Sequence, residues 1–157
     1  MTELGDIARV HTPPGGYGAV MPQPILDDCD ERPPEDAPDL RGLWRAVDAR
    51  DSDGNPLADD HPMHRHVERI EQAGDRVIVT AGGVVHDMVV DGTFENGVND
   101  VMAVDFNTAI SVAASYEDGV LVLRPQGLPG VEVRRWRDDD VLVWQYSTVF
   151  TVRMKRV

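Results

Sequence analysis

From residue 40 onward, apolar and polar residues alternate over short runs, and Gly, Asp or Asn residues separate these runs. An alternation with a period of two is typical of strands that bury one face, and the separating residues favour tight turns. No stretch of ten or more residues has the period of an amphipathic helix, which argues against a parallel sheet with covering helices. The pattern predicts strands near 42–49, 65–72, 75–81, 84–91, 99–105, 109–116, 119–125, 131–137, 140–146 and 148–156.

Short turn sequences join many of these strands and predict consecutive hairpins, which form an antiparallel meander. A meander without helices buries its apolar side by closing into a barrel or by stacking as a sandwich. The alternating faces are chemically mixed, since Val84, His86 and Met88 share one face. A ligand-holding barrel tolerates such scattered polar groups better than a sandwich core does. We therefore expect an all-β fold, an antiparallel up-and-down β-barrel of eight to ten strands.

The first 39 residues differ from the rest of the chain and form an irregular, Pro-rich N-terminal extension. They contain seven of the 11 prolines, together with Gly15, Gly16 and an acidic run. Proline disfavours helix both at its own position and at the residue before it. The extension is either a disordered solubilising tail or a strap that acts as a lid across a barrel mouth. In the second case its apolar residues would pack on the barrel: Tyr17, Val20, Met21, Ile25 and Leu26.

The barrel region, residues 40–157, carries sequences that resemble known β-barrels. Its first strand opens with Gly42-Leu43-Trp44, which resembles the Gly-x-Trp signature of lipocalins. The hairpin at 67–77 and the closing run at 142–157 are similar to those of lipocalins and intracellular fatty-acid-binding proteins. The resemblance implies a lipocalin-like (calycin) barrel in which the Trp44 ring plugs the closed end.

The same resemblance bears on the class of ligand. Fatty-acid-binding proteins hold a carboxylate with an Arg-x-Tyr pair, which would fall on Arg153-Met154-Lys155, where the tyrosine is missing. A fatty acid is therefore not implied. A Pro-rich extension before a barrel is similar in layout to small bacterial β-barrel cyclases of polyketide biosynthesis, whose N-terminal segment acts as a lid. This is a likeness of layout and not of motif.

Charge and cysteine content narrow the function classes. The formal net charge is −13, with 15 basic residues spread among 28 acidic ones, so the surface repels phosphate backbones and we expect no nucleic-acid partner. Cys29 is the single cysteine, so the chain forms no internal disulfide and fits a reducing compartment. No signal-like start and no run of about 20 apolar residues is present, which predicts a cytoplasmic protein without membrane contact. A homodimer is compatible with the sequence.

Two groups of residues are candidates for the site. A polar residue that faces the barrel lumen can act as a proton donor or acceptor. Aromatic and flexible apolar residues shape the walls of an apolar pocket, although most such rings are ordinary core. The candidate catalytic residues are His86, Tyr116 and Tyr146. The candidate ligand-binding residues are Trp44, Met88, Trp136, Trp144 and Phe150.

A second interpretation concerns the histidines. His64-Arg65-His66 with Glu71, followed by His86, resembles the ligand set of a cupin metal site, in which imidazoles and one carboxylate hold a divalent ion. In cupins, additional strands separate the His-x-His and Glu part of this motif from its last histidine. Here the part that contains His64, His66 and Glu71 lies directly before the part that contains His86. The alternative is that His61 and His64 lie on an exposed loop before the strand, and we expect no metal and no other cofactor.

The sequence thus leaves three functions open. The first is a chamber that binds a bulky apolar small molecule and promotes its cyclisation or isomerisation by holding it in a reactive conformation, which requires no strong acid or base. The second is a non-catalytic carrier or sensor of a hydrophobic ligand. The third is a cupin-like, metal-dependent enzyme.

Overall fold

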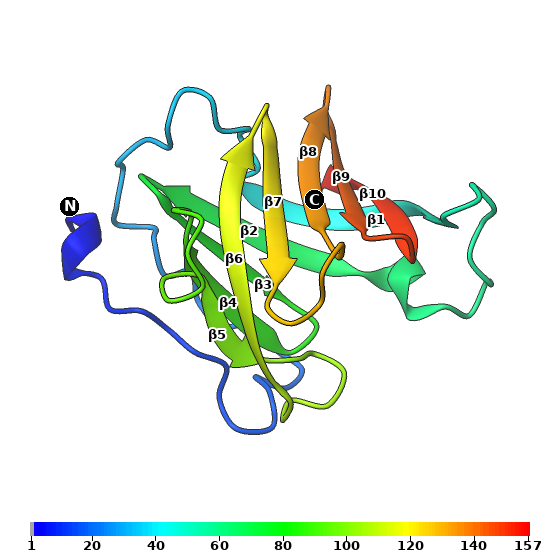
Figure 1. Ribbon diagram of the computed structural model, residues 1–157, viewed down its shortest axis with the longest axis horizontal. Helices are drawn as coiled ribbons and strands as arrows, with labels where there is room; N and C mark the ends of the chain where they lie inside the picture. The colour runs from blue at the N-terminus through cyan, green and yellow to red at the C-terminus, as the bar shows by residue number, and fades with distance from the viewer. Residues whose placement is uncertain (1) are drawn as a thin grey trace.

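Ten antiparallel strands form one continuous sheet in the computed structural model, which describes residues 2–157 (Figure 1). Short 3-10 helices lie at Leu4–Asp6 and, between the first two strands, at Pro62–Arg65 (η2). The predicted all-β, antiparallel barrel of eight to ten strands is confirmed. The strands are β1 (Gly42–Asp51), β2 (Val67–Ala73), β3 (Arg76–Ala81), β4 (Val84–Val89), β5 (Val98–Val101), β6 (Ala109–Glu117), β7 (Val120–Pro125), β8 (Val133–Asp138), β9 (Val141–Tyr146) and β10 (Phe150–Arg156).

The sheet curls almost to closure because its first and last strands pair. The strand order is β4-β3-β2-β1-β10-β9-β8-β7-β6-β5, so β1 and β10 lie at the centre, and β4 and β5 are the two ends. Within residues 2–157, the two end strands share no ladder. The backbone N–H of Val89 donates to the carbonyl of Asn96 at 2.8 Å, just before β5. The result is a nearly closed barrel with a gap between β4 and β5.

Tight turns make the meander possible. Gly82 and Gly83, between β3 and β4, have φ values of 58° and 91°, and Asp118 and Gly119, between β6 and β7, have 51° and 78°. Two successive residues with positive φ give the turn whose twist matches that of a hairpin. These turn positions agree with the sequence-based expectation.

The fifth predicted strand, 99–105, is wrong in its second half, because β5 ends at Val101. The side chain of Asp105 accepts hydrogen bonds from the backbone N–H groups of Asn107 and Thr108, both at 2.9 Å. An aspartate that binds the following backbone in this way stabilises a turn and ends the strand. The chain therefore leaves the sheet before residue 105.

A bulge in β1 decides which residues face the interior. The pairing with β10 shifts between Ala46 and Asp48, and Val47 is 58% exposed. An extra residue in one strand reverses the alternation beyond it. Ala46 and Ala49 are therefore both buried in the main core, although they are three positions apart.

One end of the barrel, here called the plugged end, is filled by Trp44. Its ring is fully buried, and its Nε1–H donates to the carbonyl of Leu40 at 2.9 Å. The Arg156 and Arg137 guanidinium groups lie 4.7 Å and 5.5 Å from the ring centroid, in cation–π contact. The basic residues let the ring close the end of the barrel while their charges remain near solvent.

The N-terminal extension packs on the outside of the sheet. Its Leu26 is buried against Ala73, Ile78 and Val85, which point outward from β2, β3 and β4. Figure 1 shows this segment, in blue, running along one side of the barrel. Val20 is 79% exposed. The extension thus covers the outer face of β2–β4.

A buried ion pair anchors the extension. Arg76 donates from Nε and Nη2 to the Asp87 carboxylate at 2.8 Å and 2.6 Å, and both side chains are almost completely buried. Arg76 also donates to the carbonyls of Ile7 and Ala8, while Asp87 accepts from the backbone N–H of Val10. The pair therefore ties β3 and β4 to the extension.

The extension also bridges the gap in the barrel. The hydroxyl of Thr12 accepts from the backbone N–H of Val85 on β4, and the backbone N–H of Thr12 donates to Asp100 on β5, both at 2.9 Å. Arg9 donates to the carbonyls of Asp87 and Gly97 on opposite sides of the gap. Residues 9–12 therefore replace the missing strand pairing.

No helix within residues 2–157 is long and apolar enough to span a membrane.

The substitution Asp87→Ala should lower the free energy of unfolding by about 3 kcal/mol, because it leaves the Arg76 guanidinium buried without its partner. Urea denaturation monitored by circular dichroism measures the loss. The exposed Asp60 provides the control, since Asp60→Ala should change stability by less than about 0.5 kcal/mol. Equal losses for the two variants would contradict the anchoring role of Asp87.

Candidate functional site

Five rings gather at the end of the barrel opposite Trp44, here called the aromatic end: His61, His66, Trp144, Tyr146 and Phe150. The strand register explains the gathering, since Tyr146 on β9 pairs with Phe150 on β10, and Phe150 pairs with Asp51 at the far end of β1. The chain segment around η2 brings the two histidine rings onto this end. The aromatic end is therefore built by three parts of the chain.

The rings form a connected stack. Tyr146 and Phe150 lie face to face, with centroids 5.3 Å apart and an interplanar angle of 27°. Trp144 meets Phe150 edge-on at 5.3 Å, and the His66 ring lies 4.6 Å from the Trp144 ring. Offset stacks and edge-to-face contacts are the arrangements that aromatic quadrupoles favour. The side chains thus hold one another in fixed orientations.

Burial differs between the two ends of the barrel. At and near the plugged end the core is closed, since Leu121, Leu142 and Met154 have no exposed surface. At the aromatic end, the Trp144, Tyr146 and Phe150 rings are only half-buried although they pack against the same core. An apolar molecule that covers these rings would remove further apolar surface from water.

A fully buried ion pair crosses the interior beside the stack. Arg135 on β8 donates from Nε to Glu68 Oε2 at 2.9 Å and from Nη2 to Oε1 at 3.3 Å. His66 Nε2 lies 2.7 Å from the same Oε1. Glu68 is on β2, so these bonds connect opposite sides of the barrel. The Arg135 guanidinium also lies 4.9 Å from the Trp144 ring centroid.

The environment of Glu68 sets its ionisation. Burial alone would raise its pKa, but the charge of Arg135 and the hydrogen bond from His66 outweigh burial and lower the pKa to about 2. The carboxylate is therefore ionised at neutral pH and has no proton to donate. His66 Nε2 must then carry the proton of the bond between them.

Trp144 has an unused polar atom. Its Nε1 is buried and has no hydrogen-bond partner among residues 2–157. A buried donor without a partner costs about 1–3 kcal/mol. Since the neighbouring side chains shield this nitrogen, an acceptor reaches it only if one of them moves aside.

The three candidate catalytic residues lie in different parts of the barrel. His86 faces inward at the gap, where its Nε2 lies 2.9 Å from the Val101 carbonyl, and burial lowers its pKa. Tyr116 lies near the plugged end, where its hydroxyl accepts from Gln72 Nε2 at 3.0 Å and burial raises its pKa. Tyr146 belongs to the aromatic end. The structure does not bring these three side chains together.

The candidate ligand-binding residues separate in the same way. Trp144 and Phe150 lie at the aromatic end, whereas Trp44 plugs the other end and Met88 is fully buried core. Trp136 is on the outer face of β8, because the alternation that points Arg135 inward points its neighbour outward. Two of the five residues therefore share one site.

The sequence analysis identified neither Arg135 nor Glu68 as a site residue. A charged residue that alternates with apolar ones on a strand is a weak signal of an inward-facing charge. The partner could not be found from the sequence, since 67 positions separate Arg135 from Glu68. Only the curvature of the closed sheet places β8 opposite β2.

The histidines do not converge as a cupin-like site requires. His64 Nε2 lies 3.0 Å from the Leu57 carbonyl, while His66 and His86 bind Glu68 and Val101. Glu71 faces outward and accepts from the backbone N–H groups of residues 25 and 26. Among residues 2–157, no group of three or more His, Cys, Asp or Glu side chains is placed to hold a metal ion.

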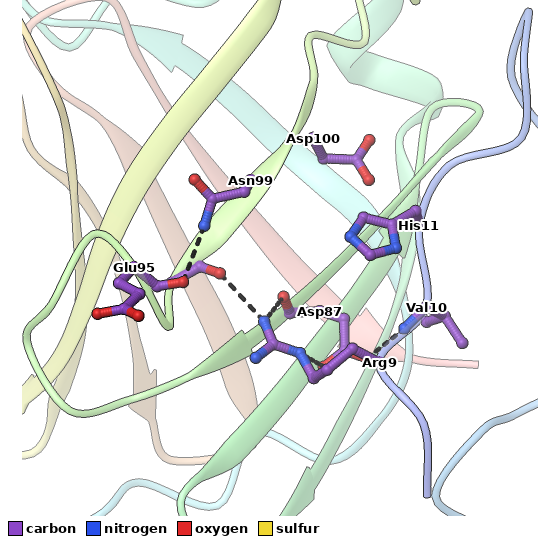
Figure 2. Close-up of a pocket in the computed structure, with 8 residues that line it drawn as sticks. Arg9, Val10, His11, Asp87, Glu95, Asn99 and Asp100 are labelled. Atoms are coloured by element: carbon purple, nitrogen blue, oxygen red, sulfur yellow. Dashed lines mark hydrogen bonds and ion pairs between the residues drawn. The ribbon is translucent and has the colours of Figure 1, made fainter.

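A hollow lies outside the barrel, over the gap. Its volume is about 210 Å³, and Figure 2 shows Arg9, His11, Asp87, Glu95 and Asp100 around it. Arg9 is already used, because it binds Asp87 and two backbone carbonyls beside β5. This hollow is therefore part of the closure of the gap by the extension.

Comparison with known proteins relates this architecture to solved structures. No family model and no curated protein matches the sequence. A solved structure that does match is human cRBP IV, a cellular retinol-binding protein, with a TM-score of 0.55 and 16% identity. The match covers 76% of this chain and 98% of that chain. The chain has a calycin-like fold. At this identity, the likeness concerns the fold alone.

The calycin-like barrel confirms the resemblance seen in Gly42-Leu43-Trp44. The signature tryptophan closes the end where the chain enters the barrel, and a basic residue near the C-terminus, Arg156, covers its ring. Gly42 has a φ of 142°, and a side chain there would meet the Arg156 guanidinium. The glycine of the signature thus leaves room for the arginine that covers the tryptophan.

The ion pair in the calycin-like barrel should make stability depend on pH. The pKa of Glu68 falls from 4.5 to about 2 on folding, so its contribution is complete above pH 4.5 and is lost as pH falls toward 2. Wild type should lose about 2 kcal/mol more than Glu68→Gln between pH 6 and pH 3. Urea denaturation at both pH values measures the difference, and the exposed-site variant Glu35→Gln should behave like wild type. The same pH response in Glu68→Gln as in wild type would contradict this assignment.

Proposed function

We propose that the barrel binds one apolar small molecule at its aromatic end and acts as a carrier or sensor of that molecule. The observation that supports this proposal most directly is the half-buried stack of Trp144, Tyr146 and Phe150, which packs on the main core. Rings in fixed orientations provide apolar contact area with little loss of conformational entropy. The fold neighbour, human cRBP IV, is named a retinol-binding protein, which agrees with this class of ligand.

The Trp144 nitrogen, which has no hydrogen-bond partner among residues 2–157, favours a ligand that carries a polar group. An apolar ligand that carries one hydrogen-bond acceptor, such as a carbonyl or hydroxyl oxygen, would give Nε1 the partner that it lacks. Pockets for small molecules commonly combine apolar walls with a few polar groups that fix the orientation of the ligand. The ligand is therefore apolar over most of its length and polar at one point.

Templated cyclisation or isomerisation is the second candidate. The fixed stack of rings favours it, because walls of defined shape restrict the conformations of a flexible substrate. General acid–base catalysis has less support, since His86, Tyr116 and Tyr146 lie apart and the first two are held by other groups. If this barrel converts a substrate, the shape of its aromatic walls, and not an acid or base, would promote the reaction.

The substitution Trp144→Phe tests the binding site, with retinol as the probe. Loss of one hydrogen bond worth about 1 kcal/mol should weaken retinol binding about fivefold, while most of the ring contact remains. Isothermal titration calorimetry measures the affinity and the stoichiometry, which we expect to be one. Trp136→Phe, on the outer face, is the matched control and should bind as wild type does. An equal effect of the two variants would place the ligand elsewhere.

Native mass spectrometry of freshly purified protein separates the two candidate functions. We expect a bound apolar compound that denaturing extraction releases and that remains chemically unchanged after it is incubated again with the protein. Recovery of a cyclised or isomerised compound from the incubation would instead favour the templating enzyme. A heat-denatured sample serves as the control for spontaneous conversion.

A further inference from the structure

We propose that the Glu68–Arg135 pair makes the aromatic end selective for uncharged ligands and excludes carboxylates. The inference rests on the proposed function, because it names the class of molecule that the same site accepts. Glu68 then acts as a specificity-determining residue. It sets the net charge of the interior next to the rings without touching the ligand.

The geometry leaves little of the arginine charge for a ligand. Arg135 directs Nε and Nη2 to the two oxygens of Glu68, and His66 shares one of these oxygens. The side chains of Glu68 and Arg135 are 0% and 6% exposed. A guanidinium held by two nitrogens to one carboxylate has its strongest binding edge occupied. A ligand carboxylate would therefore have to use Nη1, which lies outside these two bonds, and would lie close to the Glu68 charge.

The charges also disfavour an anion. The Glu68 carboxylate is surrounded by protein, where the low effective dielectric makes repulsion between like charges several times stronger than in water. A ligand carboxylate near the Trp144 ring would lose its hydration and meet this second negative charge. The Arg135 charge offsets one carboxylate but not two.

The Arg137 guanidinium lies at the plugged end, and the Arg65 guanidinium lies in solvent. Arg137 donates to the carbonyls of Asp139 and Asp39 and stacks on Trp44 at the plugged end. Arg65, on η2, is exposed to solvent. Uncharged polar groups are present at the site, namely the Tyr146 hydroxyl and the buried N–H of Trp144. Both can donate to a carbonyl or hydroxyl oxygen.

The test compares probes that differ only in their polar group. Retinol and retinoic acid form one pair, and hexadecanol and hexadecanoate form a second pair without a ring. Binding of each probe to the full chain at pH 7.5 is measured by isothermal titration calorimetry. We expect wild type to bind each alcohol at least about tenfold more tightly than the matching acid, equivalent to about 1.4 kcal/mol.

The substitution Glu68→Gln keeps the shape of the side chain, removes its charge and leaves the Arg135 charge unpaired. The preference should then reverse, and the acids should gain affinity by at least about tenfold. The exposed-site variant Glu35→Gln should keep the wild-type preference. If Glu68→Gln does not fold, the double variant Glu68→Gln, Arg135→Gln, which has no buried charge at the pair, should bind alcohol and acid with similar affinity.

Each outcome has a distinct meaning. Equal or tighter binding of the acids by wild type would overturn the selectivity while leaving the proposed ligand-binding function intact. An unchanged preference in folded Glu68→Gln would also overturn it. Failure of wild type to bind any of the four probes would instead contradict the proposed function. A wild-type preference for alcohols that reverses in Glu68→Gln would support both.

Discussion

The two unpaired ends of the sheet are the constraint on which the rest of the structure depends. In this ten-stranded sheet β1 pairs with β10, and the edges of β4 and β5 come close together without forming a ladder of hydrogen bonds. Their edges expose backbone groups that require partners. Residues 9–12 supply these partners, and the buried pair of Arg76 and Asp87 holds the extension in place. An irregular chain suits this role, because it can bond to two strands that do not lie in ladder register.

Closure also divides the interior into two ends with different chemistry. The plugged end is apolar and fully buried around Trp44, whereas the aromatic end holds half-buried rings. The pair of Glu68 and Arg135 lies beside the rings and links opposite walls. Buried charges are tolerated when they are paired and hydrogen-bonded, as both are here. Such a pair holds the Arg135 guanidinium over the Trp144 ring, and in our proposal it sets which ligand charge the barrel accepts.

The alternation of residues predicts which face of a strand a side chain occupies. It does not predict the position of that side chain along the barrel axis, here called its height. His86, Tyr116 and Tyr146 all belong to inward faces, yet they lie at the gap, the plugged end and the aromatic end. Height depends on strand tilt and on the length of each hairpin, which are properties of the closed sheet. Polar residues on one common face therefore did not form a common site.

The sequence by itself determined the strands, their antiparallel order, the main turns and the plug, because alternation, turn residues and the Gly-x-Trp signature are local signals. It also indicated three residues of the aromatic end, Trp144, Tyr146 and Phe150. Only the tertiary structure decided that Trp136 faces outward, that the extension closes the gap, and that Arg135 pairs with Glu68. These features depend on register and curvature, which bring together residues that are distant in the chain and leave no local pattern.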